Sequence, residues 1–543
     1  MNLKRNWNCP DKETGIAEKA VHYGKELCSV LVGIWTVLMT AVFPLSMKNH
    51  FFQLGEHKFQ FFLRVSLYCL IPAAAVLLTS LAAEKNRTGK GKFSILDYGM
   101  LFYALFSFAS WRFSINRQLA WTGTDGWYGG LRTQLLLVLI YFLVSRSFSW
   151  SKLIFLGHFL CSGVVFLLGI GHRFDIDPLG MYEGIDPSYR LQFLSTIGQA
   201  TWYSSYVCTV LVIGVVLFFL TKRSALRLGL GAYCVLGFAT VVTQNSDSAF
   251  VAMAFLCFGL LLAACDSLDR IERLFEVLIL MFGTFKLVGI FQLFFPEHAM
   301  RLDGLSEFLS QSLGSWIILL LFCALYMGIQ IYRSKNPTKN EIVKGRLLRK
   351  TVWGLLIIGL GMYVLFLWLN TSGLLERILG IRPDHTYLLF DYHWGNSRGF
   401  IWKFVLYAFR DFSIGEKIWG IGPDCFSAYC YAKEDLAGIL NRFFGHGQTL
   451  TNAHNEFLNT LFCMGIAGLI SYLTVFTVAF RRFFAEQKSS PLALIGALVV
   501  LVYASHNFFC YQQVCCTPFL FLILGMAENA VRNNQKTAGN YLL

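Results

Sequence analysis

The stretch LCSVLVGIWTVLMTAVFPL, residues 27–45, contains no charged residue. A helix over this stretch, at a rise of about 1.5 Å per residue, matches the roughly 30 Å hydrocarbon layer of a membrane. The segment before it is polar and charged, and it lacks the short apolar region and small-residue cleavage site of a secretory signal. We therefore expect an uncleaved transmembrane helix here.

Similar apolar runs recur to the end of the sequence. Of the 543 residues, 55% are hydrophobic and 14% are charged, a composition that excludes an ordinary soluble globular protein. The runs fall at 27–46, 61–83, 96–111, 131–149, 152–171, 194–220, 226–244, 249–265, 274–295, 313–332, 351–370, 456–480, 491–512 and 514–531. We predict an all-α polytopic membrane protein with about 12–14 transmembrane helices in a lipid bilayer.

The formal net charge of +14 follows the connections between these runs. Lys and Arg gather in alternate connections such as EKNRTGKGK (84–92) and RSKNPTKNEIVKGRLLRK (333–350), whereas FDIDPLGMYEGIDP (174–187) is acidic. Basic loops remain on the cytoplasmic side of a membrane, so both termini are expected to be cytoplasmic. Topology accounts for the positive charge, and we expect no nucleic-acid partner.

The predicted topology divides the chain into five parts. Residues 1–26 form a cytoplasmic N-terminal segment, and 27–370 form a transmembrane bundle of about eleven spans. One long extracytoplasmic loop follows at 371–455, then C-terminal transmembrane helices at 456–531 and a cytoplasmic tail at 532–543. A loop of this length among short connections indicates a functional role.

Most of the fifteen cysteines are scattered singly within apolar runs, and no CxxC pair is present. This spacing is not that of a zinc or iron–sulfur site, and we expect no metal or cofactor. Only Cys425 and Cys430 lie close together in a polar loop, where both a disulfide and two reduced thiols are compatible with the sequence.

The long loop contains a stretch typical of a helix, NSRGFIWKFVLYAFRDF (396–412), with Ser397 as its expected N-cap. Arg398 then lies in the first helical turn, where a guanidinium beside free backbone amides forms a natural clamp for an anion such as phosphate. An interfacial arginine that reaches lipid headgroups is the alternative. GIGPDCF (420–426) ends the following segment with turn residues.

His454 stands where a polar segment turns apolar, in TNAHNEFLNTLFCMGIAG (451–468). With Asn452 as the helix cap, His454 falls in the first turn, where the helix dipole favours the neutral imidazole that a general base requires. Gly465 and Gly468 would lie on the same narrow stripe of this helix and admit a close neighbour. The alternative is a packing pair below an interfacial histidine.

Three further groups are candidates. A second His–Asn pair, His506–Asn507, lies near the outer end of another run but lacks the glycine stripe. Arg190 lies at the outer mouth of a run, where it either shares an anion with Arg398 or reaches headgroups. Lys286 lies inside an apolar run, either as a functional group or as a structural tie to Asp247 or to a carbonyl.

The order His-Asn, nine residues, Gly, two residues, Gly in HNEFLNTLFCMGIAG (454–468) resembles the signature of the O-antigen ligase and O-antigen polymerase superfamily. SRGFIWKFVLYAFRDFSIGEKIWGIGPDCF (397–426) is similar to the segment that precedes it there, an Arg-x-x-x-Trp helix and a Gly-x-Gly-Pro turn. The sequence departs from the family pattern at GQATW (198–202), which follows Arg190, and at TQNSDSAF (243–250).

The resemblance implies a GT-C-like, metal-independent glycosyltransferase of the bacterial cytoplasmic (inner) membrane. Such an enzyme moves a glycan from an undecaprenyl diphosphate carrier, on the outer side of the membrane, to a hydroxyl of a glycan, lipid or cell-wall acceptor. By the resemblance, the catalytic residues are His454, the base, and Arg398, which holds the diphosphate. The substrate-binding residues are Arg190, Asn455 and Trp402, and Gly465 and Gly468 serve helix packing.

The resemblance does not separate ligase from polymerase, which differ in the acceptor. A flippase or exporter of lipid-linked oligosaccharide is the alternative from another functional class. Transporters of that kind place polar groups near the membrane midplane in broken helices of matched halves. In this sequence the polar candidates gather near the outer surface and in one loop.

Overall fold

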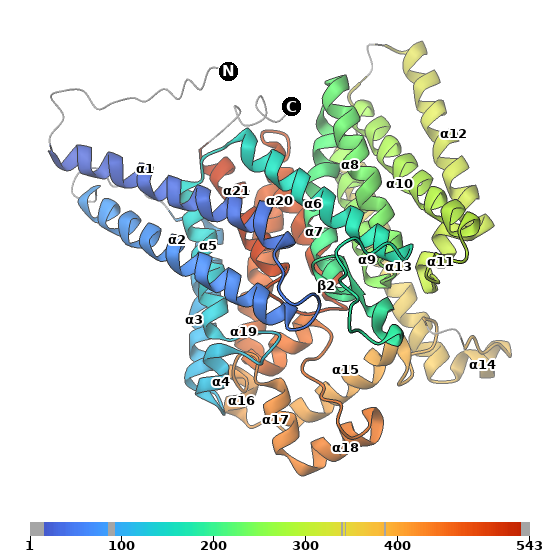
Figure 1. The fold of residues 1–543 in the computed structure, drawn as a ribbon. Helices are drawn as coiled ribbons and strands as arrows, with labels where there is room; N and C mark the ends of the chain where they lie inside the picture. Colours follow the sequence, from blue (N-terminus) through green and yellow to red (C-terminus); the bar gives the residue numbers. More distant parts are fainter. Residues whose placement is uncertain (1–15, 85–92, 338–339, 343, 385–386, 534–543) are drawn as a thin grey trace.

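The computed structural model describes residues 16–84, 93–337, 340–342, 344–384 and 387–533 (Figure 1). Over these ranges the chain is almost entirely helical, and its strands are one short antiparallel pair, β1 (Phe193–Leu194) and β2 (Gly198–Gln199). Ten of the described helices are long and apolar enough to cross a membrane. The predicted all-α polytopic membrane fold is confirmed.

Each of the fourteen predicted runs coincides with a helix. They are α1 (Ile16–Val37, extended by the short turns η1, Leu38–Val42, and η2, Phe43–Leu45), α2 (Leu54–Glu84), α3 (Ile95–Arg112), α5 (Leu131–Ser147), α6 (Lys152–Arg173), α7 (Ala200–Leu220), α8 (Ser224–Thr243), α9 (Asp247–Ala264), α10 (Leu268–Phe294), α12 (Leu313–Lys335), α13 (Gly345–Thr371), α19 (Glu456–Ala485), α20 (Pro491–Asn507) and α21 (Thr517–Arg532). The four that are not among the ten candidate spans, α3, α5, α20 and α21, have 16 to 18 residues each.

Some helices start at other positions than the predicted runs. The run at 194–220 begins with the β1–β2 hairpin, because Gly198 takes φ +100° and the helix starts only at Ala200. At the N-terminus α1 already begins at Ile16, inside the segment expected to be polar and non-membrane. Residues 85–92 and 534–543, which hold most of one basic loop and of the expected tail, lie outside the described residues.

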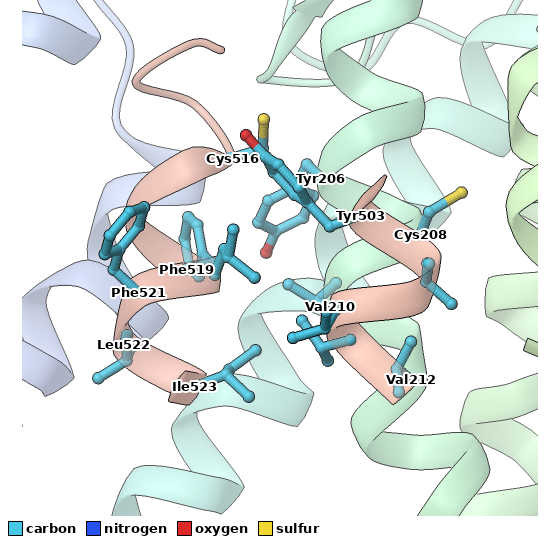
Figure 2. Close-up of a cluster of buried hydrophobic side chains, with 14 of the residues drawn as sticks. Tyr206, Cys208, Val210, Val212, Tyr503, Cys516, Phe519, Phe521, Leu522 and Ile523 are labelled. Atoms are coloured by element: carbon cyan, nitrogen blue, oxygen red, sulfur yellow. The ribbon is translucent and has the colours of Figure 1, made fainter. Parts of the chain in front are cut away.

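The helices α7, α20 and α21 form the centre of the bundle. α7 is buried along almost its whole length, and its residues are nearly all apolar or small. Figure 2 shows Tyr206 of α7, Tyr503 of α20 and Phe519 of α21 among the side chains of this cluster. Tyr206 and Phe519 meet edge to face with 5.2 Å between ring centroids. Such packing of rigid side chains fixes how the connections at the helix ends are placed.

The helix α12 lies at the side of the bundle (Figure 1), and both α12 (Leu313–Lys335) and α13 (Gly345–Thr371) expose apolar side chains along their length. An apolar helix with so little protein around it requires lipid as its solvent, so these helices mark the face toward the bilayer. Lys286 of α10 helps to hold this side together, because its ammonium donates to the carbonyls of Ser310 (3.0 Å) and Ser312 (2.8 Å). Lys286 is therefore the structural tie to a carbonyl that the sequence left open.

The segment between α13 and α19 carries α14 (Leu374–Leu379), α15 (Trp394–Arg410), α16 (Ile414–Trp419), α17 (Phe426–Ala432) and α18 (Glu434–Phe444). These helices gather at one end of the bundle, the lower end in Figure 1. Because consecutive spans run in opposite directions, the connections 46–53, 113–130, 174–199, 244–246, 295–312 and 508–516 emerge at this same end. These connections and the α14–α18 segment form a layer that we call the loop end.

Candidate functional site

His454 lies just before α19 and is not part of it. The N-cap is Asn455, whose side-chain oxygen accepts the N–H of Leu458 at 2.9 Å, so the helix begins at Glu456. Asn452 instead accepts the N–H of His454 at 2.9 Å, and His454 takes a left-handed conformation with φ +47°. The expected cap at Asn452, with His454 in the first helical turn, is wrong because the Asn452 side chain serves the turn ahead of the helix.

The surroundings of His454 still keep its imidazole neutral. Burial lowers the pKa of His454 to about 4, and the positive charge of Arg398 lowers it further in the same direction. Its ring meets the ring of Tyr511 edge to face, with centroids 5.4 Å apart. We expected the helix dipole to keep the imidazole neutral. In the structure, burial and the neighbouring Arg398 guanidinium have this effect instead.

Arg398 is fixed by backbone carbonyls at the start of α15. Gly395, Asn396 and Ser397 all take left-handed conformations, and the regular right-handed helix follows them. Ser397, with φ +66°, is therefore not the extended N-cap that the sequence predicted. The Arg398 guanidinium donates to the carbonyl of Gly395 at 2.6 Å and to that of Phe509 at 3.0 Å.

His454 and Arg398 therefore meet at one short segment of the loop end. Arg398 bonds to Phe509, the ring of His454 contacts Tyr511, and both partners belong to the connection between α20 and α21. Burial lowers the pKa of the Arg398 guanidinium, although the nearby Asp247 carboxylate opposes this effect. The structure thus brings together the two residues expected to be catalytic.

Gly465 is the point at which the two segments of the sequence pattern, 397–426 and 454–468, contact each other. It has φ +71° and breaks α19, so the stripe of a straight helix that linked Gly465 to His454 does not exist. A Cβ at Gly465 would lie 2.3 Å from the carbonyl oxygen of Ile418. The break also frees the carbonyl of Cys463, which accepts the N–H of Gly422 at 2.9 Å. The close neighbour that we expected to be a helix is therefore the turn after α16.

Gly468 lies within α19, three residues after the break at Gly465. A Cβ there would lie 2.4 Å from the Cβ of Met464, because the kink at Gly465 folds Met464 back onto this position. Gly468 thus packs against its own helix, and the expectation that it admits a neighbouring helix is wrong.

The two expected substrate-binding residues of the motif lie close to this centre. Asn455 is buried, and its oxygen is used by the cap of α19. Trp402 packs between Trp394 (5.3 Å between centroids) and Phe508 (5.4 Å). Its buried indole N–H has no hydrogen-bond partner among the described residues, so it is a free donor next to Arg398.

Arg190 is held elsewhere on the loop end. It lies in the short turn η3 (Pro187–Gln192), 3.6 Å from the carboxylate of Asp175 and over the ring of Tyr182 at 5.5 Å. No contact of the described residues joins it to Arg398 or His454. The structure therefore does not bring the two arginines onto one anion.

Glu456 is a buried acid that sequence reasoning missed. Its carboxylate accepts the hydroxyl of Tyr503 at 3.1 Å, and it also accepts the hydroxyl of Tyr472 and the side-chain amide of Asn507. Each of these donors comes from a different turn of α19 or α20. An acidic residue at the entry of an apolar span is itself a signal of function, and it is visible in the sequence two positions after His454.

His506 extends this buried network toward the bundle centre. Its ring nitrogens lie 2.5 Å from the hydroxyl of Ser204, 3.1 Å from that of Ser248 and 2.9 Å from the side-chain oxygen of Asn507. His506 is fully buried and satisfied by these partners. Among the described residues, His506 is linked to Glu456 through Asn507, so it lies one side chain further from His454 than Glu456 does.

The cysteines and the metal-binding residue types give no further site. Cys425 and Cys430 are both buried free thiols. Within the described ranges, no three His, Cys, Asp or Glu side chains are arranged to hold a metal ion.

No protein-family model matches the sequence, and no curated protein matches it significantly.

Proposed function

We propose that the chain is a metal-independent membrane glycosyltransferase, similar to O-antigen ligases or polysaccharide polymerases. It moves a glycan from an undecaprenyl diphosphate carrier to an acceptor hydroxyl on the outer side of the bacterial cytoplasmic membrane. The observation that carries the proposal is the placement of a neutral histidine, His454, beside a partly buried arginine, Arg398, at the loop end. The contact between the two sequence motifs supports it, because the end of α16 packs against α19 at Gly465.

These two side chains suit the displacement of a diphosphate from a sugar. His454 takes the proton of the acceptor hydroxyl while its oxygen attacks the anomeric carbon. The bond between that carbon and the diphosphate oxygen breaks, and the electron pair leaves with the diphosphate. Arg398 lies where its positive charge can stabilise this leaving group, and the indole N–H of Trp402 is a second donor.

The pKa of about 4 makes His454 a weak base in the free protein. A bound diphosphate, however, offsets the charge of Arg398, which removes one of the two causes of the lowered pKa. The donor therefore strengthens the base that acts on the acceptor, which ties proton transfer to the presence of the carrier-linked glycan.

The loop end is placed on the outer side of the membrane, with both termini cytoplasmic. The basic connections support this orientation, because 221–227, 333–350 and 481–488 emerge at the end of the bundle opposite to His454. The acceptor is a hydroxyl of a glycan, a lipid or the cell wall.

A deletion strain tests the proposal against a flippase or exporter. The expected result is that undecaprenyl diphosphate-linked glycan accumulates on the outer leaflet, where a membrane-impermeant glycosidase or lectin reaches it in intact spheroplasts. Accumulation on the inner leaflet alone would contradict the proposal and would indicate a flippase. Re-expression of the chain removes the accumulated carrier if the deletion itself is the cause.

A further inference from the structure

A cavity of about 540 Å³ opens at the loop end next to the proposed site. Three connections build it: the α1–α2 turn, the segment 123–130 before α5, and the β1–β2 hairpin with the start of α7. Its lining includes four aromatic rings (Phe51, Tyr128, Phe193 and Trp202), two acids (Glu56 and Asp125) and two amides (Gln53 and Gln199). The volume lies within the roughly 300–1,000 Å³ of small-molecule sites.

The connections around this cavity are tied down. Lys58, buried in α2, donates to the carbonyls of Phe43 (2.7 Å) and Pro44 (2.8 Å) at the end of the first span. Thr196 of the hairpin donates to the same carbonyl of Pro44 at 2.7 Å. On the opposite side, the carboxylate of Asp424 accepts the N–H groups of Thr124 (2.7 Å) and Gly129 (2.9 Å). The cavity is therefore a preformed feature of the fold.

The chemistry of the lining points to a hydroxylated ligand. None of the residues that line it is Lys, Arg or His, and a cavity with two carboxylates and no cation disfavours phosphate. Asp125 and Gln53 are exposed at its mouth, and their side chains make no hydrogen bond or ion pair with the described residues. They are free to bond hydroxyl groups, while aromatic rings offer apolar faces for the C–H face of a sugar ring.

One lining residue of the cavity, Trp202, contacts a residue that packs against His454. The indole N–H of Trp202 donates to the hydroxyl of Tyr511 at 3.1 Å, and Tyr511 carries the ring that contacts His454. Trp127 packs edge to face on both Trp202 (5.3 Å) and Tyr511 (4.9 Å). A ligand against Trp202 thus lies one side chain away from the partner of the proposed base.

We propose that this cavity is a saccharide subsite that holds a sugar unit of the glycan being transferred or of the glycan that receives it. The inference rests on the proposed function for the role of the sugar, whereas the binding itself does not depend on transfer. The aromatic rings bind the sugar faces, and Gln53 and Asp125 select its hydroxyls. The subsite sets the register of the glycan relative to His454.

Binding is measured by saturation-transfer NMR on the purified chain in lipid nanodiscs. The probe is the delipidated surface glycan released by mild acid from the strain that carries the protein. Because both side chains are exposed, Gln53→Ala and Asp125→Ala should fold normally and weaken binding by roughly tenfold each, the effect of a lost hydrogen bond to a ligand. The matched controls are Gln118→Ala and Glu297→Ala, also exposed at the loop end, which should bind as the wild type does.

Two further arms separate this inference from the proposed function. His454→Ala should bind the glycan like the wild type, and inorganic diphosphate should not displace it. In a transfer assay, a raised KM for the carrier-linked donor or for the acceptor in Gln53→Ala identifies which glycan occupies the cavity. Unchanged binding in both cavity variants, or displacement of the glycan by diphosphate, would overturn the saccharide subsite whether or not the chain transfers glycans.

Discussion

At the residue scale, the charge of Arg398 and the protonation of His454 are coupled. His454 has a pKa of about 4 in the free protein, so it is neutral across the physiological range. Removal of the guanidinium, as in Arg398→Gln, removes a cause that disfavours the imidazolium, and the pKa of His454 should rise toward its ordinary value near 6.5. Bound inorganic diphosphate should raise the pKa in the same direction.

The coupling is measured by NMR titration of histidine-labelled protein, with His454→Ala used to assign the signal. In the wild type the His454 signal should not titrate between pH 5 and 8, whereas in Arg398→Gln its midpoint should move to higher pH than in the wild type. An identical titration in both proteins would show that the two side chains are not coupled.

Glu456 is a second residue whose surroundings lead to a prediction, in this case about stability. Its carboxylate accepts hydrogen bonds from Tyr472, Tyr503 and Asn507 inside the bundle. Glu456→Ala leaves these buried donors unpaired and should lower the free energy of unfolding by about 2–5 kcal/mol. Glu456→Gln keeps an acceptor of similar size and should cost less.

Thermal unfolding in nanodiscs compares these two variants with Glu297→Ala, an exposed control. If Glu456→Ala unfolds at the wild-type temperature, the network around Glu456 does not stabilise the fold in the way its hydrogen bonds indicate.

At the scale of elements, the break of α19 is the feature that lets the end of α16 and the turn after it pack against this helix. Gly465 combines φ +71° with a carbonyl 2.3 Å from where a Cβ would stand. Gly465→Ala should therefore push the turn after α16 away and lower the free energy of unfolding by about 2–4 kcal/mol. Gly354→Ala on α13, where nothing lies within 4 Å, should change stability by about 1 kcal/mol or less.

Both variants are compared by thermal unfolding and by protease protection of the loop after α16. Cleavage near Ile418 in Gly465→Ala, but not in Gly354→Ala, is the expected pattern. Equal protection and equal stability of the two variants would mean that the turn is held by other contacts than the break of α19.

The elements could largely be predicted from the sequence, while the details of the site could not. Apolar runs are local signals, and each of the fourteen fell on a helix. The break at Gly465 depends on a turn more than forty positions earlier in the chain, at 420–422, and no local pattern records that contact. The structure places His454 near Arg398, whereas its left-handed conformation, which no local pattern predicts, goes with the use of Asn452 in the turn and of Asn455 as the cap.

Arg190 and Glu456 show opposite failures of sequence reasoning. Arg190 was grouped with Arg398 because both precede apolar or helical stretches at the outer surface, yet its carboxylate partner Asp175 lies in its own connection. Glu456 was overlooked beside His454, although a buried acid needs partners and so indicates a network. Spacing in the sequence records neither relation, because both depend on which connections pack together at the loop end.

At the scale of the whole molecule, the account requires the loop end to face outward. Cysteine substitutions at exposed positions test this, because each of the cysteines that the structure describes is buried or only partly exposed and reacts slowly. Gln118→Cys, before α5, should react with a membrane-impermeant maleimide in intact cells. Lys222→Cys, between α7 and α8, should react only after the membrane is permeabilised; the reverse pattern would invert the topology.

The central claim is that His454 activates the acceptor while Arg398 holds the carrier diphosphate. The most direct measurement supplies purified protein in nanodiscs with undecaprenyl diphosphate-linked glycan and acceptor, and follows the glycan transferred per minute. His454→Ala should lower this rate by about 10²–10⁴-fold, the usual contribution of a general base, while His446→Ala, an exposed histidine of the same loop, keeps the wild-type rate. Transfer by His454→Ala at the wild-type rate would contradict the account.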